Sequence, residues 1–339
     1  MRQEKGRGGA AWTHLDAQII RRPYDREGAF MTTTHATTSA TPAPDNVAGG
    51  AWALAAVLAA TVMTIGVREA AVGVDTRMVV LMRSMMILAA FALILPLPRV
   101  RASLRCSRPW LHLLRGCLLG ASIQLGFHTI AEVPLATATV LFFTAPIFAT
   151  LLAGPINGEK IGARRMGAVA VGFLGALIIL RPGAGDMDLA MLGGLASSML
   201  FALALTLSRG VAAADGALSA FMSSVAITAL ISIPIAAPVW ALPSAADLWI
   251  AVAVTAVAGA LRGIADLESY RRGEASVMGV ISYLRLVALG LVGWLMFDET
   301  PDLLTWLGGA VIICSTLYIA HREQRLRRAR RTPVAGPGH

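Results

Sequence analysis

Apolar residues recur in runs of about 20, separated by charged, proline or glycine positions, from about residue 50 to residue 321. A helix of that length matches the hydrocarbon core of a bilayer, because each helical residue advances roughly 1.5 Å. Lipid offers no partner for backbone N–H and C=O groups, so helices are expected throughout. The pattern predicts an all-α integral membrane protein with ten transmembrane helices. The expected spans are 50–68, 76–96, 109–129, 133–154, 162–181, 187–208, 217–240, 246–268, 274–297 and 302–321.

Composition agrees with this pattern. Apolar residues make up 56% of the chain, charged residues only 14%, and the mean hydropathy is +0.67. A soluble protein of this length would cover its cores with charge, so a water-soluble domain is excluded. The formal net charge of +9 is compatible with nucleic acid binding, but the basic residues lie in tails and short loops. No nucleic acid partner is expected.

The basic residues are distributed unequally between the two faces of the membrane. If the N-terminus is inside, sixteen Lys and Arg residues fall on the inner side. Short cytoplasmic loops carry such an excess of basic residues. We therefore expect a multi-pass protein of the cytoplasmic (inner) membrane with both termini in the cytoplasm. The opposite face collects acids. They are Asp75, Glu132, Asp186, Asp188, Asp247, Asp298, Glu299 and Asp302, beside Arg68, Arg77 and Arg181.

The two ends of the chain are polar. Residues 1–48 include a tract of Thr, Ser and Pro without helical period, which predicts a disordered cytoplasmic tail. The first apolar run begins only near Ala51, too late for a secretory signal. Met31 is a hypothesis for the true start, with Met1 as the alternative. Residues 322–339 form a basic cytoplasmic tail. Cys106, Cys117 and Cys314 lack metal-ligand spacing, so neither a metal nor a cofactor is expected.

The chain aligns with itself when it is shifted by 140 positions. Seven identities appear across the fourth and fifth spans and the ninth and tenth, and Glu159 with Glu299 is the informative pair. Each of these acids ends one apolar run just before another. Five spans per half place the second half upside down, which predicts inverted five-helix repeats at 49–183 and 184–321. Many transporters build two exchangeable conformations from such repeats.

Short motifs recur in order over both halves. In the first half they are 134–146 (PLATATVLFFTAP), Gly158-Glu159, Arg165, Gly167, Gly172, Gly175 and 181–183 (RPG). In the second half they are Tyr283, Leu286, Trp294, Phe297, Glu299, Pro301, Leu307-Gly308 and Tyr318.

Together these motifs resemble the drug/metabolite transporter superfamily, in its ten-helix EamA-like branch. The resemblance covers roughly residues 48–322 and implies a transporter of small metabolites, most similar to members linked with riboflavin or S-adenosylmethionine uptake. The chain departs from the family pattern after the tyrosine of the ninth span. It has Leu284 and then Arg285, where relatives usually have an uncharged residue.

Two arginines are the main candidates for substrate binding. Arg285 lies about eleven residues into its span, near the bilayer centre, where an unpaired charge costs several kcal/mol. It meets either a carboxylate or phosphate of the substrate or an acid on a neighbouring helix. Arg83 lies about eight residues into the second span, roughly 10 Å deep, and matches an arginine common in the family. For Arg83 the alternative is snorkelling to the interface.

Other polar and aromatic residues also lie within the spans. Gln124, His128 and Glu132 form a stripe at four-residue spacing, with Gln124 and His128 facing a wet cavity or substrate and Glu132 available for ion coupling. Arg262 and Asp266 are four apart and can pair on one helix face, which favours a self-satisfied pair over a gating role. Tyr283 could stack on a planar substrate or serve in packing.

Three classes of function compete. The leading hypothesis is a secondary transporter for a small organic metabolite, working by alternating access between the two repeats. A membrane-embedded enzyme is the alternative, but the sequence has no HExxH, no phosphate-binding glycine loop and no nucleophile with a paired base. A scaffold or receptor subunit would need neither inverted repeats nor charges at mid-depth. Without an ATP-binding motif, the expected driving force is a gradient or exchange.

Overall fold

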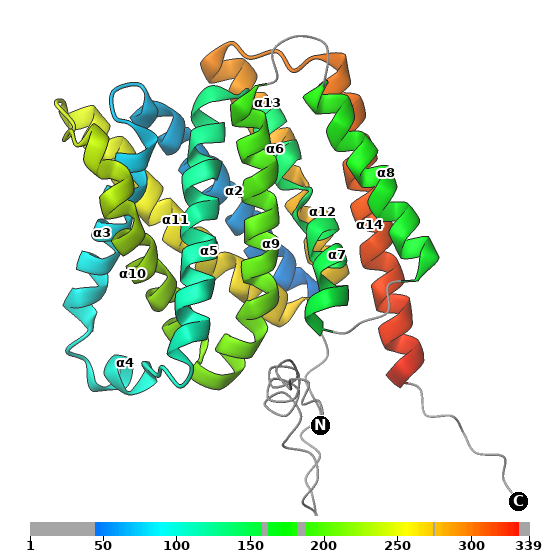
Figure 1. The fold of residues 1–339 in the computed structure, drawn as a ribbon, viewed down its shortest axis with the longest axis horizontal. Coiled ribbons are helices and arrows are strands. Elements are labelled where there is room, and N and C mark those ends of the chain that lie inside the picture. Colours follow the sequence, from blue (N-terminus) through cyan, green and yellow to red (C-terminus); the bar gives the residue numbers. More distant parts are fainter. Residues whose placement is uncertain (1–44, 158–161, 182–187, 274, 332–339) are drawn as a thin grey trace, which may run out of the picture. The chain divides into compact units, whose positions relative to one another are not determined.

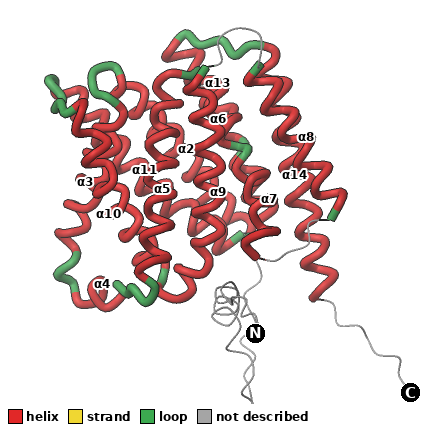
Figure 2. The backbone as a smooth tube through the Cα atoms, viewed as in Figure 1, coloured by secondary structure: helices red, strands yellow, loops and turns green. Residues whose placement is uncertain are grey.

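The computed structural model describes residues 45–157, 162–181, 188–273 and 275–331, and every regular element within these ranges is a helix (Figures 1 and 2). The helices are α2 (Asn46–Ala71), α3 (Thr76–Ile94), α4 (Pro98–Ser103), α5 (Pro109–Glu132), α6 (Leu135–Phe142), α7 (Ala145–Asn157), α8 (Ala163–Leu180), α9 (Leu189–Asp215), α10 (Ala217–Ala236), the 3₁₀ turn η1 (Ala237–Val239), α11 (Ala246–Arg272), α12 (Ala275–Ser282), α13 (Leu284–Phe297) and α14 (Leu303–Arg331).

Eight segments of the described chain are long and apolar enough to cross a membrane. Two of them, Leu135–Leu152 and Val277–Phe297, each combine two consecutive helices. The prediction of an all-α membrane protein is confirmed. The remaining two expected spans correspond to α5, which carries several polar side chains, and to α8, whose apolar part is Met166–Leu180. The short helix α4 lies where only a loop was expected.

Local sequence explains where several helices begin. Asp45 caps α2, because its Oδ1 accepts hydrogen bonds from the Val47 and Ala48 amides at 3.1 and 2.9 Å. Asp75 caps α3 in the same way through the Arg77 amide at 2.9 Å. Between α9 and α10 the chain turns at Gly216, whose φ of +85° favours glycine.

The fourth and ninth expected spans are interrupted. The first breaks between Phe142 and Ala145, where Pro146 cannot donate to the carbonyl of residue 142 and its ring crowds that carbonyl. The second breaks at Tyr283, which separates α12 from α13. The bounds of α6 and α12 differ by 140 at both ends, and α8 and α14 also begin 140 residues apart. The spacing found in the sequence therefore recurs in the positions of the helices.

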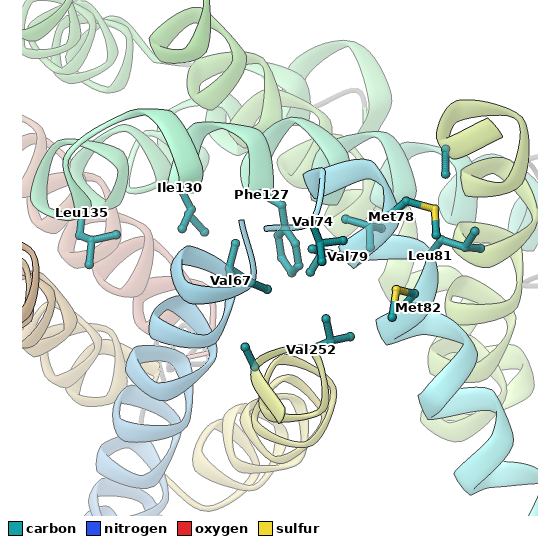
Figure 3. Packing of buried hydrophobic residues seen from close by; sticks show 14 of the residues in the cluster. Val67, Val74, Met78, Val79, Leu81, Met82, Phe127, Ile130, Leu135 and Val252 are labelled. Carbon is teal, nitrogen blue, oxygen red and sulfur yellow. The ribbon is translucent and has the colours of Figure 1, made fainter. Parts of the chain in front are cut away.

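The helices pack in pairs that bring distant segments together. α2 lies along α11, α5 along α9, and α8 along α14, as Figure 1 shows. At the last contact a Cβ on Gly308 would lie 2.6 Å from the Gly175 carbonyl oxygen, so small residues are needed there. A buried apolar cluster around Val67, Met78 and Phe127 joins α2, α3, α5 and α11 (Figure 3). This packing fixes the helices that carry the polar residues described next.

Candidate functional site

The two helix breaks meet. The ring of Phe143, at the end of α6, lies 4.9 Å from the ring of Tyr283 in an edge-to-face contact with an interplanar angle of 63°. These two residues are themselves 140 positions apart. The Tyr283 hydroxyl is in hydrogen-bonding contact with the side chain of Thr316 on α14. We call Phe143 and Tyr283 the break pair.

Arg83 reaches from α3 onto the surface of α11. Its Nε donates to the Thr255 carbonyl oxygen at 3.3 Å, and its guanidinium lies 5.5 Å from the centre of the Phe127 ring. A Cβ placed on Gly259 would be 2.5 Å from Nη2 of Arg83. Glycine at 259 therefore makes room for the guanidinium, a role that sequence reasoning missed.

Further polar groups follow on the same side of α11. Thr255, Gly259, Arg262 and Asp266 are spaced by four, three and four residues, which places them along one helix face. Arg262 and Asp266 form an ion pair with a distance of 3.5 Å between Nε and Oδ2. The pair is partly exposed, with 31% and 47% of the two side chains accessible.

Arg285 lies in the first turn of α13, next to the break pair. Its Nε is buried without a hydrogen-bond partner. The guanidinium interacts electrostatically with Arg262 and Asp266, and Arg83 also interacts with Arg262. The structure thus brings together Arg83, Arg262, Asp266 and Arg285, which we call the arginine cluster.

The predicted stripe on α5 divides into two environments. Gln124 is buried and its Nε2 donates to Ser232 Oγ on α10 at 2.9 Å, while its Oε1 is buried without a partner. His128 and Glu132 are exposed nearer the end of the helix. His128 interacts electrostatically with Asp75, at the start of α3.

Another arginine, on α2, has four oxygen partners. Nη1 of Arg68 lies 2.7, 2.8 and 3.2 Å from the carbonyl oxygens of Ile130, Ala131 and Val133, and Nη2 is 2.5 Å from Glu299 Oε1. The other carboxylate oxygen of Glu299 accepts from the Leu135 amide at 2.7 Å. These contacts, which we call the Arg68 tie, connect α2, the α5–α6 turn and the end of α13. Glu159, the acid that corresponds to Glu299, lies outside the described residues.

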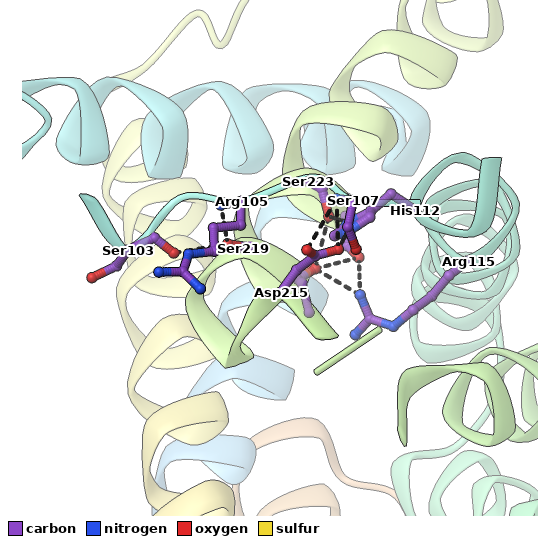
Figure 4. A network of polar contacts seen from close by, with 10 residues as sticks. Ser103, Arg105, Ser107, His112, Arg115, Asp215, Ser219 and Ser223 are labelled. Carbon is purple, nitrogen blue, oxygen red and sulfur yellow. Dashed lines mark hydrogen bonds and ion pairs between the residues drawn. The ribbon is translucent and has the colours of Figure 1, made fainter. Parts of the chain in front are cut away.

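A second polar network joins the start of α5, the end of α9 and the start of α10 (Figure 4). His112 Nε2 is 2.9 Å from Asp215 Oδ2, and His112 Nδ1 is 2.6 Å from Ser223 Oγ. Asp215 also accepts from the Ser107 amide. The hydrogen bond from His112 lowers the pKa of the Asp215 carboxyl, an effect that burial partly opposes. An open pocket of about 240 Å³ lies beside this network.

Arg115 continues this network one turn further along α5. Its Nε donates to Ser208 Oγ at 2.6 Å, and its Nη1 donates to the Ala220 carbonyl and to Ser224 Oγ. Neither this arginine nor the pairing of His112 with Asp215 was predicted, because their partners are about 100 residues away in sequence. Within the described residues, no group of three or more His, Cys, Asp or Glu side chains could hold a metal ion.

Comparison with known proteins gives matches over most of the chain. Residues 47–181 match the model of the EamA-like transporter family. An S-adenosylmethionine uptake transporter from Rickettsia bellii is 30% identical over 66% of this chain and 76% of its own length. A riboflavin transporter from Vibrio cholerae is 29% identical over 84% of this chain and 96% of its length. A pseudopaline exporter from Pseudomonas aeruginosa is 26% identical over 80% and 96%.

A solved crystal structure supports the same fold. It covers 83% of this chain and 100% of its own, with a TM-score of 0.54 and 17% identity.

Proposed function

Because this chain belongs to the EamA-like transporter family, we propose that it is a secondary transporter that moves a small organic metabolite across the cytoplasmic membrane. The protein is a multi-pass membrane protein and a transporter rather than an enzyme. Its relatives are named as an uptake transporter, a transporter and an exporter, for chemically different molecules. The general function is therefore shared, while the substrate must be sought in this chain's own residues.

The proposed mechanism is alternating access between two inverted five-helix repeats, residues 49–183 and 184–321. The observation that carries it is the contact between the two helix breaks, Phe143 and Tyr283, at positions 140 apart. Discontinuous helices at the repeat interface are where transporters bind substrate near the bilayer midplane. The packing of α2 on α11 and of α5 on α9 agrees, since an inverted repeat would exchange these two pairs.

Substrate binding is assigned to Arg83, Gln124, His128, Tyr283 and Arg285. Tyr283 forms the second break and Arg285 follows it by two residues, while Arg83 lies against α11. Oε1 of Gln124, which has no partner among the described residues, offers an acceptor. Glu132, Arg262 and Asp266 are proposed to act in coupling or gating. The Arg262–Asp266 pair suits this role, because its two side chains are 3.5 Å apart and Arg262 interacts with both Arg83 and Arg285.

Flux into vesicles tests the function. The purified chain is reconstituted, and uptake of riboflavin and of S-adenosylmethionine is measured with and without a pH gradient. We expect saturable flux of a small metabolite such as these two compounds. The flux should fall when Phe143 and Tyr283 are both replaced by alanine. Vesicles without protein control for leakage. A transport function would be rejected if flux equals that of empty vesicles for riboflavin, S-adenosylmethionine, flavin mononucleotide and glutarate.

The orientation is tested separately. We propose ten crossings with both termini in the cytoplasm, which places the exposed Asp302 outside. After Cys106, Cys117 and Cys314 are replaced by serine, a cysteine at Asp302 should react with an impermeant maleimide in intact cells. Reaction only after the inner face is opened would reverse the topology.

A further inference from the structure

We infer that the arginine cluster binds a doubly negative group of the transported molecule, either two carboxylates or one phosphate. This inference rests on the transport function proposed above and adds the chemical class of the substrate. It follows from the charges in the cluster, from hydrogen-bond donors without acceptors, and from the position of the cluster beside the break pair.

The charges of the cluster do not cancel. Arg83, Arg262 and Arg285 bring three positive charges, and Asp266 brings one negative charge. Among the described residues, Arg262 and Asp266 are the charged groups that interact with Arg285, and Arg262 is the one that interacts with Arg83. Two positive charges therefore remain at mid-depth in spans α3 and α13, where charge without a partner is costly. A ligand with two negative charges would balance them.

The hydrogen-bond donors of these arginines are also mostly unused. A guanidinium has five N–H donors. Within the described part of the chain, Arg83 makes one hydrogen bond, at 3.3 Å, and Arg262 contacts Asp266 at 3.5 Å through Nε alone. In the ranges that the structure describes, the Arg285 guanidinium has no hydrogen bond, and its Nε is buried. Planar forks of this kind match the oxygen spacing of carboxylate and phosphate, which they bind through two parallel hydrogen bonds.

The position of the cluster gives a place for the rest of the ligand. Arg285 follows Tyr283 by two residues, so the cluster borders the break pair. Phe127 faces the Arg83 guanidinium from α5. An anionic group at the arginines would thus leave an organic body against aromatic rings.

The first test measures the protein without ligand. If the cluster is kept for a ligand, Arg285→Gln relieves repulsion, and the melting temperature of the purified protein should stay the same or rise. Arg115→Gln is the matched control, because Arg115 is also an intramembrane arginine on a long helix but has three hydrogen bonds. Its melting temperature should fall. A fall for Arg285→Gln as large as that for Arg115→Gln would show a structural role and overturn the inference.

The second test uses pairs of probes that differ in charge. Flavin mononucleotide is compared with riboflavin, and glutarate with glutaramide, by their effect on melting temperature and by flux into vesicles. We expect the anionic member of at least one pair to bind more tightly, and Arg285→Gln to weaken that binding by roughly tenfold or more. Arg285→Lys should retain part of the affinity through charge alone.

The outcomes separate this inference from the transport function. Flux of an anionic probe that is unchanged in Arg285→Gln would overturn the inference and leave transport standing. Failure of every anionic probe to bind would also overturn it. Absence of flux for all probes would reject transport, while tighter binding of an anionic probe, lost in Arg285→Gln, would still support the site. Tighter binding of flavin mononucleotide indicates a phosphate, and tighter binding of glutarate indicates two carboxylates.

Discussion

The Arg68 tie and the arginine cluster place the same side chain in two different situations. Arg68 has four oxygen acceptors within 3.2 Å and is 21% exposed. Arg83 has one acceptor at 3.3 Å, and the Nε of Arg285 is buried without any. Burial of an arginine is stabilising only when its charge and donors are matched. The first arginine therefore connects helices, whereas the few acceptors around the others, among the described residues, are the basis of our proposal that they bind a ligand.

The largest effect is expected when the Arg68 tie is broken. Arg68→Ala leaves the Glu299 carboxylate and three carbonyl oxygens without their partner, and loss of one member of a buried ion pair costs about 3–5 kcal/mol. Thermal unfolding in detergent measures this. The double variant Arg68→Ala, Glu299→Gln should recover part of the loss. If Arg68→Ala is as stable as wild type, the contrast with the cluster fails.

A smaller effect is expected from Gly259→Ala. The new Cβ would lie 2.5 Å from Arg83 Nη2, so the guanidinium must move. Because this atom is the end of a flexible side chain, the net change in stability should stay within about 1 kcal/mol. Probe binding should weaken with it. Gly263→Ala on the same helix is the control, because its Cβ meets only a ring atom of Phe221 at 3.8 Å, and it should stabilise by about 0.5–1 kcal/mol. If both variants bind the anionic probes equally well, the position of the Arg83 guanidinium does not affect ligand binding.

The network around Asp215 extends the comparison to pH. Its hydrogen bond to His112 lowers the pKa of the carboxyl in the folded state. A carboxyl with a lowered pKa stabilises the fold above its unfolded pKa of about 3.9, and this contribution is lost as the pH falls through the folded value. Asp215→Asn should therefore lower the melting temperature at neutral pH and flatten its decline in acid. Parallel curves for variant and wild type, from pH 7 to acid, would exclude the network as a source of stability.

The smallest effect is expected at the surface. Arg77 pairs with Asp75 at 2.8 Å, and the hydrogen bond from its side chain lowers the pKa of that carboxyl. Both side chains are substantially exposed, so Arg77→Ala should change stability by less than about 1 kcal/mol. Chemical denaturation of a reconstituted sample is sensitive enough to measure such a change. A loss comparable to that of Arg68→Ala would mean that the number of acceptors does not predict the contribution of an arginine.

The sequence predicted the helices well and their interruptions poorly. Apolar periodicity continues across 142–145 and 282–284, so nothing in the hydropathy pattern marks the breaks, and only Pro146 gave a local signal. The repeat spacing of 140 was readable because it needs only comparison of the chain with itself. The helix break at Tyr283 could not be predicted from the sequence, because it depends on contacts with other helices.

The candidate site was found residue by residue but not as a group. Charge at mid-depth identified Arg83 and Arg285, and four-residue spacing identified Arg262 with Asp266. Their proximity depends on contacts between helices that are far apart in the chain, such as α3 and α11, which no local pattern encodes. Gly259 was missed for the same reason. Its role depends on the Arg83 guanidinium, which occupies the space that a side chain at position 259 would need.

The Arg68 tie also constrains how this sequence can evolve. One guanidinium and one carboxylate connect three segments that are far apart in the chain, since Glu299 also holds the Leu135 amide. Loss of either side chain leaves the other buried beside oxygen atoms or amides that it was matched to. Substitutions at positions 68 and 299 should therefore be tolerated together and rarely alone, and the two positions are expected to covary among homologues while their neighbours on the lipid-facing side drift independently.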